Sequence, residues 1–170
     1  FESKSSMTNR KVYFNGEFVS EQEARISIFD SALMFGDMVF DMTRTYRQKP
    51  FRLRAHLERI YAGLRYLEID CGLTLAQLEA ATLQTLDLNL PLMDGADAQI
   101  MHNFSRGPLS IYKSVFGGTL RPTVTINCWP YWWHLADYGP LYRSGVSAFV
   151  TPQRSVPAHL LDPKVKNRSR

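Results

Sequence analysis

The chain has 170 residues, of which 45% belong to the hydrophobic set, so it can bury one good core with little left over. Its net charge is only +4, and the basic excess gathers near the end of the chain, which argues against a nucleic-acid-binding protein. No window holds the roughly 18 consecutive apolar residues of a membrane helix, and the first twenty residues lack the apolar core of a secretory signal, so we expect a cytoplasmic protein without a membrane partner.

The first predicted element is a β-hairpin close to the start of the chain. Residues 1–6 are polar and contain no initiating Met, so we treat them as a remnant or a disordered leader, with Met7 as the natural start. In the stretch VYFNGEFV, residues 12–19, an Asn-Gly pair separates two runs of apolar strand formers, which is the strongest short-range signal for a hairpin. The fold is therefore expected to begin with strands.

A strand and two helices are predicted next. Over residues 38–47 apolar and polar side chains alternate, which predicts a half-buried strand. After Phe51, apolar residues recur at helical spacing and predict a helix with one apolar face. That face consists of Leu57, Ile60, Tyr61, Leu64 and Leu67. A second helix is expected to begin at Thr74, which can form a capping box with Gln77, and to end near Asn89.

Two further alternating stretches, residues 98–105 and 123–128, predict the remaining strands of a first domain. Strands, two helices and then strands indicate an α+β fold, which we assign to residues 7–135 as a small N-terminal domain with an antiparallel sheet and two helices. We expect residues 136–170 to be an interdomain connection and the start of a second, larger, β-rich domain, with a strand over residues 145–151.

The cysteines and histidines form no metal-binding pattern. Cys71 and Cys128 lie far apart, without a CxxC or Cys/His ligand spacing. None of the four histidines, His56, His102, His134 and His159, is paired at ligand spacing. We therefore expect reduced structural thiols and no metal site.

Four stretches, in this order along the chain, resemble the class IV (fold type IV) pyridoxal-phosphate-dependent transaminases, and among them the branched-chain amino acid aminotransferases. They are VYFNGEFV (12–19), DSALMFGDMVFDMTR (30–44), FRLRAHLERI (51–60) and DPKVKNRSR (162–170). The chain resembles the N-terminal portion of such an enzyme, ending just after the cofactor lysine. The resemblance implies pyridoxal 5′-phosphate as cofactor, and an amino acid and a 2-oxo acid as substrates.

The resemblance also implies which residues hold the cofactor. Lys166, rather than Lys164, matches the lysine that binds the cofactor aldehyde and then moves a proton between substrate and cofactor. Arg59 matches the arginine that binds the cofactor phosphate, for which a permanently charged fork of donors is suited. Without the resemblance, Lys166 is read as an exposed lysine of a basic tail, and Arg59 as a solvated helix residue paired with Glu58 or with a residue one turn away.

Substrate-binding residues are also implied. Phe35 and Phe40 match positions that line the side-chain pocket, although core packing would also account for them. Arg44 and Arg106 are possible partners of a substrate carboxylate, and Arg106 can alternatively brace a turn. The strand containing Gln99-Ile100-Met101 lacks the Tyr and Arg that branched-chain members commonly carry there, so the departure leaves the substrate open.

Other functions remain possible at this point. The stretch Phe104-Ser105-Arg106-Gly107 resembles the Thr-Arg-Gly stretch of D-amino acid and (R)-amine transaminases, and an aminodeoxychorismate lyase of the same family uses similar residues. From another class, the chain could be a non-catalytic interaction module with a basic tail. The resemblance further implies a homodimer. Residues 129–133, rich in Trp and Tyr, suit an interface or an interdomain patch, although core packing would also account for them. Because family members continue past the lysine, we expect this chain alone to bind the cofactor weakly.

Overall fold

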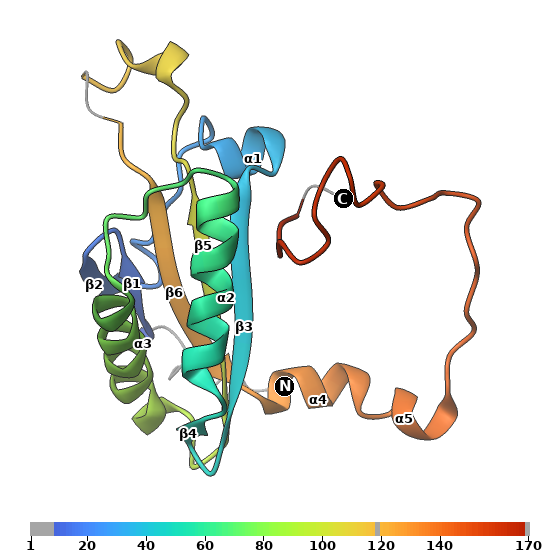
Figure 1. Ribbon diagram of the computed structural model, residues 1–170. Helices are drawn as coiled ribbons and strands as arrows, with labels where there is room; N and C mark the ends of the chain where they lie inside the picture. Colours follow the sequence, from blue (N-terminus) through green and yellow to red (C-terminus); the bar gives the residue numbers. More distant parts are fainter. Residues whose placement is uncertain (1–8, 118–119, 169–170) are drawn as a thin grey trace.

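In the computed structural model, which describes residues 9–117 and 120–168, six strands form one antiparallel sheet in the order β2-β1-β6-β5-β3-β4 (Figure 1). The strands are β1 (Lys11–Phe14), β2 (Glu17–Ser20), β3 (Met38–Tyr46), β4 (Lys49–Pro50), β5 (Ala98–Ser105) and β6 (Thr123–Pro130). The helices are α1 (Ser31–Phe35), α2 (Leu53–Tyr66), α3 (Leu75–Asn89), α4 (Trp132–Tyr138) and α5 (Leu141–Ser144), with short 3-10 turns η2 (Leu90–Leu92) and η3 (Ser110–Tyr112). The predicted α+β class is confirmed, and the prediction for residues 1–6 lies outside the described residues.

The hairpin predicted near the start is present as β1 and β2. Asn15 and Gly16 both have positive φ, +50° and +104°, which is the turn geometry that an Asn-Gly pair favours. Tyr13 pairs with Phe18 across the two strands, and their rings lie edge to face at 5.4 Å. The hairpin joins the sheet through β6, so the first and last strands of the domain are neighbours.

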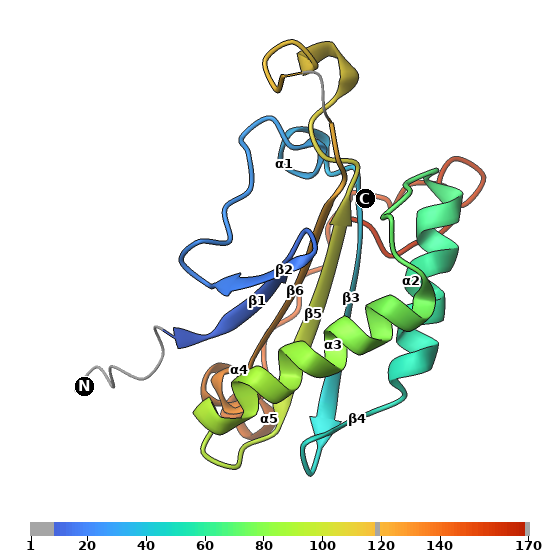
Figure 2. The same ribbon diagram turned by 90° about the vertical axis from the view of Figure 1, so that its left-hand side faces the viewer.

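The two long helices cover one face of the sheet (Figure 2). The apolar face of α2 is confirmed, since Leu57, Ile60 and Leu64 are buried against the sheet. Helix α3 begins at the predicted capping box, in which Gln77 N–H donates to Thr74 Oγ1 at 3.2 Å and Thr74 N–H donates to Gln77 Oε1 at 2.8 Å. Each fully buried Leu or Ile contributes roughly 1.5–3 kcal/mol, so these two helix faces account for much of the core.

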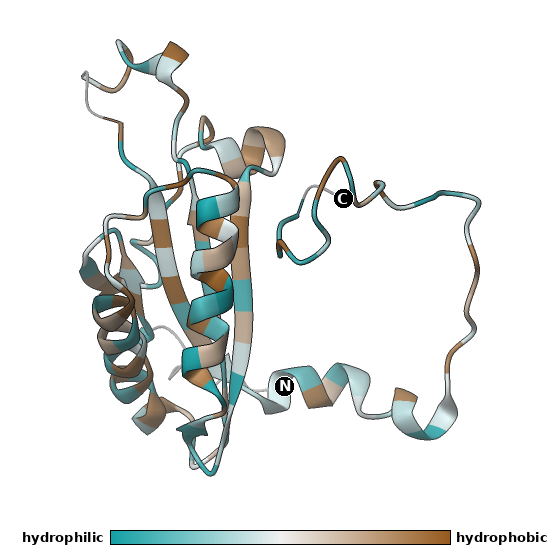
Figure 3. Ribbon diagram, in the orientation of Figure 1, coloured by the Kyte–Doolittle hydropathy of each residue, from teal (hydrophilic) through white to brown (hydrophobic). Residues whose placement is uncertain are grey.

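Strand β3 is mostly polar on the face that the helices cover, and the apolar residue there is Val39. Asp41, Thr43 and Thr45 face α2 and are buried, whereas Phe40 and Met42 lie on the other face and are partly exposed. Figure 3 shows that this strand is hydrophobic at its start and carries hydrophilic residues from its middle onward. Burying hydroxyls and a carboxylate costs free energy unless each is hydrogen-bonded. The buried polar residues of β3 therefore mark a place where polar groups have specific partners.

The chain after β6 leaves the sheet and then returns to it (Figure 1). Helices α4 and α5 are followed by an extended stretch, residues 146–156, in which all side chains are exposed. The predicted strand over residues 145–151 is wrong, because a strand needs a neighbour to pair with and this stretch lies against none in the described chain. Residues 162–168 come back to the edge of β3, and the division into domains at residue 135 stays a prediction.

The longest helices among the described residues are α2 and α3. Neither they nor any other helix in residues 9–117 and 120–168 combines the length and the apolar character required to cross a membrane.

Candidate active site

A buried carboxylate lies at the centre of a cluster of cationic side chains beside β3. Asp41 is 0% exposed and points toward α2. Its Oδ1 accepts a hydrogen bond from the backbone N–H of Met42 at 2.6 Å. An isolated carboxylate at such a position would be costly to ionise, so its surroundings decide whether it carries charge.

Helix α2 supplies two of the partners of Asp41. His56 and Arg59 are three residues apart and therefore share one face of the helix. Arg59 binds Asp41 with two hydrogen bonds, from Nε to Oδ2 at 2.6 Å and from Nη2 to Oδ1 at 2.7 Å. His56 Nδ1 lies 3.0 Å from Asp41 Oδ1. The bidentate geometry of Arg59 fixes the plane of the guanidinium relative to the strand.

The partners keep Asp41 ionised. Burial by itself raises the pKa of the carboxyl, but the hydrogen bond from Arg59, the one from His56 and the charges of Arg59 and Lys166 outweigh it, so the net pKa lies below the usual 3.8. The same hydrogen bond, acting against burial and together with the charge of Asp41, raises the pKa of the Arg59 guanidinium above its ordinary value. Asp41 and Arg59 are therefore both charged at neutral pH.

The returning C-terminal segment brings Lys166 to this cluster. The backbone N–H of Phe40 donates to the carbonyl of Lys166 at 3.0 Å, which attaches the segment to the edge of β3. Lys166 Nζ lies 3.8 Å from Asp41 Oδ1 and 5.1 Å from the centre of the Phe40 ring. Val165 is buried, and its side chain packs close to Gly63 of α2.

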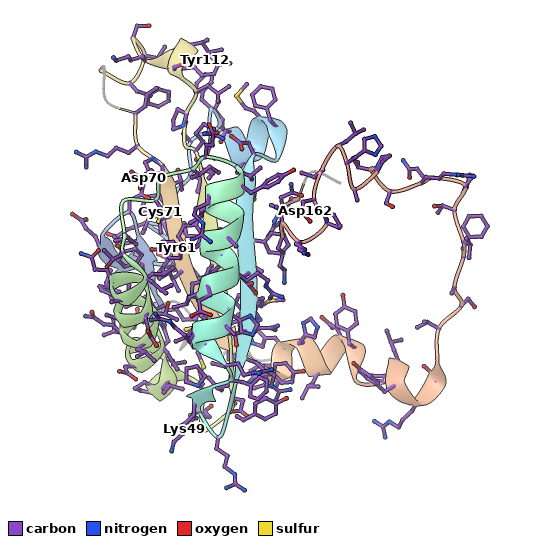
Figure 4. All side chains as sticks on the ribbon, in the orientation of Figure 1. Lys49, Tyr61, Asp70, Cys71, Tyr112 and Asp162 are labelled. Atoms are coloured by element: carbon purple, nitrogen blue, oxygen red, sulfur yellow. The ribbon has the colours of Figure 1, made fainter. Side chains whose placement is uncertain are left out.

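The start of the returning segment, residues 162–168, is attached to the C-terminal end of α2. The backbone N–H of Asp162 donates to the Tyr66 hydroxyl at 3.3 Å. Figure 4 shows Asp162 beside the upper part of α2, with the segment running from there toward the helix and β3.

A cavity of about 810 Å³ opens between α2 and this segment. Its lining consists of Phe40, Arg59, Ala62, Pro163, Lys164, Lys166 and Asn167. Asn167 is 8% exposed, and its Oδ1 makes no hydrogen bond with any residue that the structure describes. A buried amide oxygen without a protein partner is uncommon, and it is free to accept a hydrogen bond from water or from a ligand in the cavity.

Of the residues predicted from the sequence, Phe40, Arg59 and Lys166 come together at this cavity. Phe35 is the last residue of α1 and is 58% exposed. Arg44 lies farther along β3, where its guanidinium is stacked between two tyrosine rings, 4.2 Å from the centre of Tyr46 and 3.8 Å from that of Tyr131.

Arg106 has partners of its own. It binds Asp37 from Nε at 2.8 Å and donates to the carbonyls of Leu67 and Glu68 at 2.7 and 2.9 Å. These contacts join the loop after β5 to the end of α2, which is the bracing arrangement that the sequence offered as the alternative.

Sequence reasoning did not single out Asp41, His56 or Asn167. The sequence did contain a signal for Asp41 and His56. Asp41 is an acid in the alternating strand, and the helix that follows the strand carries His56 and Arg59 on adjacent turns. No signal connected Asn167 to the cavity. Within the described residues, no group of three His, Cys, Asp or Glu side chains is arranged to hold a metal ion.

Comparison with known proteins agrees with this arrangement of elements. The family model described as amino-transferase class IV matches residues 38–170. The chain belongs to this family. It is 32% identical over 160 residues to the "Putative branched-chain-amino-acid aminotransferase" of Methanocaldococcus jannaschii, a match that covers 92% of this chain and 51% of the relative. The chain thus spans about half the length of this relative.

Two other similarities extend the comparison. A D-alanine aminotransferase of Bacillus licheniformis is 30% identical over 120 residues, which are 71% of this chain and 41% of that protein. The solved branched-chain aminotransferase of Thermoproteus uzoniensis with norvaline has the same fold, with a TM-score of 0.72 and 26% identity over 92% of this chain and 50% of that chain. Class IV aminotransferases use pyridoxal 5′-phosphate as cofactor.

The residues around the cavity fit this cofactor. Pyridoxal phosphate carries its aldehyde and its phosphate arm on neighbouring ring carbons, so the amine and the cation that bind them must lie close together. Lys166 and Arg59 meet this requirement, because Lys166 Nζ lies 3.8 Å and Arg59 Nε 2.6 Å from oxygens of the same carboxylate. The volume of about 810 Å³ lies in the range of small-molecule sites, roughly 300–1,000 Å³.

Proposed function

We propose that this chain is the lysine-bearing part of a pyridoxal-phosphate-dependent transaminase, which transfers an amino group between a branched-chain or other aliphatic amino acid and a 2-oxo acid. The observation that carries the proposal is the convergence of the Lys166 amine and the Arg59 guanidinium on one carboxylate beside a cavity. Membership of the class IV family supports it, because that chemistry is common to these aminotransferases.

Each side chain at the cavity has a role in this proposal. When bound, pyridoxal phosphate supplies an aldehyde for an amine and an aromatic ring that accepts electrons from the substrate α carbon. Lys166 would hold the aldehyde through its amine, with loss of one water. Once the substrate amine has replaced it there, the freed Lys166 amine would act as base and acid toward the substrate α carbon. Arg59 would donate hydrogen bonds to the phosphate dianion, and the Phe40 ring would form an apolar wall.

The aliphatic substrate class has two kinds of support. The relative from Methanocaldococcus jannaschii carries a branched-chain name. The uncovered face of the sheet also presents partly exposed apolar side chains at Phe40, Met42 and Met101, which suit an aliphatic side chain. A D-amino acid transaminase is the second candidate, because D-alanine aminotransferases are among the relatives. Activity with L-leucine against D-alanine, with 2-oxoglutarate as acceptor, separates the two.

The expected assembly rests on the sequence resemblance, and the expected location on the hydropathy pattern of the sequence. We propose a homodimer in the cytoplasm. The Phe35, Arg44 and Arg106 contributions to substrate binding likewise stay predictions. Sedimentation of the chain with and without cofactor tests the dimer.

The central test is covalent trapping. The chain is mixed with pyridoxal phosphate, reduced with borohydride and digested, and the modified lysine is identified by mass spectrometry. We expect modification at Lys166, together with an absorbance band that Lys166→Ala removes. Lys164→Ala is the matched control, because Lys164 is two residues away and lines the same cavity. Modification at Lys164 instead, or scattered over surface lysines, would overturn the proposal.

A further inference from the structure

The structure contains two buried carboxylates of different character among the described residues. Asp30 is 1% exposed and is satisfied mainly by neutral donors, with Oδ1 capping α1 through Ala32 N–H and Oδ2 accepting from the Thr123 hydroxyl. Asp41 is 0% exposed and is surrounded by cationic or ionisable groups. A helix cap explains the first, whereas nothing in the secondary structure requires the second.

We propose that Asp41 is a positioning residue, which orients Arg59 toward the cofactor phosphate and lies between Arg59 and Lys166, where its negative charge offsets theirs. The inference rests on the proposed function. It assigns to Asp41 a role that no sequence motif gave it, and it makes the carboxylate the element that connects the two ends of the site.

The orientation of Arg59 is the first step. Its side chain is 48% exposed and would otherwise sample many rotamers, because a long arginine side chain has several rotatable bonds. Asp41 engages Nε and Nη2, so the guanidinium plane is set from a strand that the core holds rigid. The third nitrogen, Nη1, donates to no residue that the structure describes and remains available for an anion at the cavity.

The rigidity of Asp41 itself is the second step. Its Oδ1 accepts from the Met42 backbone N–H and lies 3.0 Å from His56 Nδ1, while Arg59 binds both oxygens. A carboxylate bound from a strand and from two turns of a helix cannot rotate without breaking several of these contacts. The position of Arg59 is thereby determined by the packing of α2 on β3.

The balance of charge is the third step. Arg59 and Lys166 would repel each other if both were cations in a partly buried site, and the anion between them removes that repulsion. Asp41 offsets one of these two positive charges, and Lys164 in the cavity lining adds a third, so a positive excess remains beside the cavity. That excess favours an anionic ligand without the cost of two unpaired cations.

The test compares pyridoxal phosphate with pyridoxal, which has the aldehyde but lacks the phosphate. Asp41→Asn removes the charge and keeps the size of the side chain. We expect the affinity for pyridoxal phosphate to fall roughly tenfold or more, the size expected when one charge-assisted contact is lost, and the affinity for pyridoxal to change far less. Arg59→Gln should give the same pattern, and combining the two substitutions should cost little more than either alone.

A control variant and a second measurement distinguish the positioning role of Asp41 from a general loss of structure. Asp97→Asn is the matched control, because Asp97 accepts hydrogen bonds from Thr45 and Gln48 at the far end of β3 and touches none of the cavity lining. In the chain without cofactor, the Nε–H proton of Arg59 should exchange slowly with water in the original protein and in Asp97→Asn. It should exchange rapidly in Asp41→Asn.

The outcomes separate this inference from the proposed function. If the original chain forms no adduct at Lys166, the proposed function fails and this inference fails with it. If it forms the adduct but Asp41→Asn weakens pyridoxal and pyridoxal phosphate equally, only the positioning role is overturned. Should Asp41→Asn not fold, Arg59→Lys retains the charge without the fork, and unchanged affinity for pyridoxal phosphate in that variant would refute the inference.

Discussion

The buried histidine of β5 makes the free energy of unfolding of this protein fall as the pH falls below neutral. His102 is 0% exposed, and its Nε2 lies 2.9 Å from the Thr82 hydroxyl. Because that hydroxyl donates to the carbonyl of Leu78, it accepts from His102, so Nε2 carries a proton, and the lowered pKa of the ring leaves Nδ1 without one at pH 7. Burial lowers the pKa of His102 to about 4, against a smaller raising effect from the charge of Asp41 and with a further lowering effect from His56.

The direction of the effect depends on which state binds the proton first. The unfolded chain takes up a proton near pH 6.5 and the folded chain only near pH 4, so stability is complete above pH 6.5 and is lost as the pH falls toward 4. The full difference corresponds to about 3 kcal/mol, and about 2 kcal/mol of it is lost between pH 7 and 4.5. The lowered pKa of Asp41 keeps that carboxylate ionised over this interval, so it adds little to the change.

Urea denaturation at pH 7 and pH 4.5, at constant ionic strength, measures the effect. His102→Gln cannot take up the proton but can still donate to Thr82, so its free energy of unfolding should fall by about 2 kcal/mol less than that of the original protein over the same interval. Other ionisable groups change in both proteins and cancel in the comparison. Parallel losses in the two proteins would refute the assignment of a neutral, buried His102.

Three further predictions concern substitutions that should lower the stability of the domain. Gly63→Val should lower the free energy of unfolding by about 1–3 kcal/mol and weaken pyridoxal phosphate binding, because even a Cβ there would lie 3.1 Å from the Val39 side chain; unchanged urea midpoint and affinity would contradict it. Gly107→Ala should cost roughly 2–4 kcal/mol, since φ is +76° and the new methyl group would overlap the Arg121 carbonyl, and an unchanged melting temperature would refute this. Asn89→Ala should cost about 2–4 kcal/mol by removing its hydrogen bonds to the backbone N–H and C=O of residue 11, so thermal unfolding without a shift would contradict that account.

Most of the small domain was predictable because its signals are local. The Asn-Gly turn, the capping box at Thr74 and the helical spacing of Leu57, Ile60 and Leu64 each act within a few residues, and the structure confirms the hairpin and both helices. Alternation also located β3, but alternation alone does not say which face the helices cover. The covered face is the polar one, and this depends on partners in other elements.

The site was predictable only in part, for the same physical reason. The resemblance drew attention to Arg59 and Lys166, and the structure brings them to one cavity. Asp41 joins them through contacts between residues 18 and 125 positions apart in the chain, which no spacing rule can reveal. The prediction of a strand over residues 145–151 was wrong for a different reason. Its local pattern suits a strand, but the part of the chain that the structure describes offers no neighbouring strand for it to pair with.

The exposed stretch over residues 146–156 has a consequence for how Lys166 reaches its site. The segment over residues 162–168 docks on the edge of β3 and is joined to the rest of the chain by this exposed stretch, and such a covalent connection raises the effective concentration of the docking segment. A few contacts are then sufficient for docking, among them the hydrogen bond from Phe40 and the packing of Val165 against α2. Substitutions within the tether should therefore leave the lysine in position, whereas shortening it below the span would remove the lysine from the site.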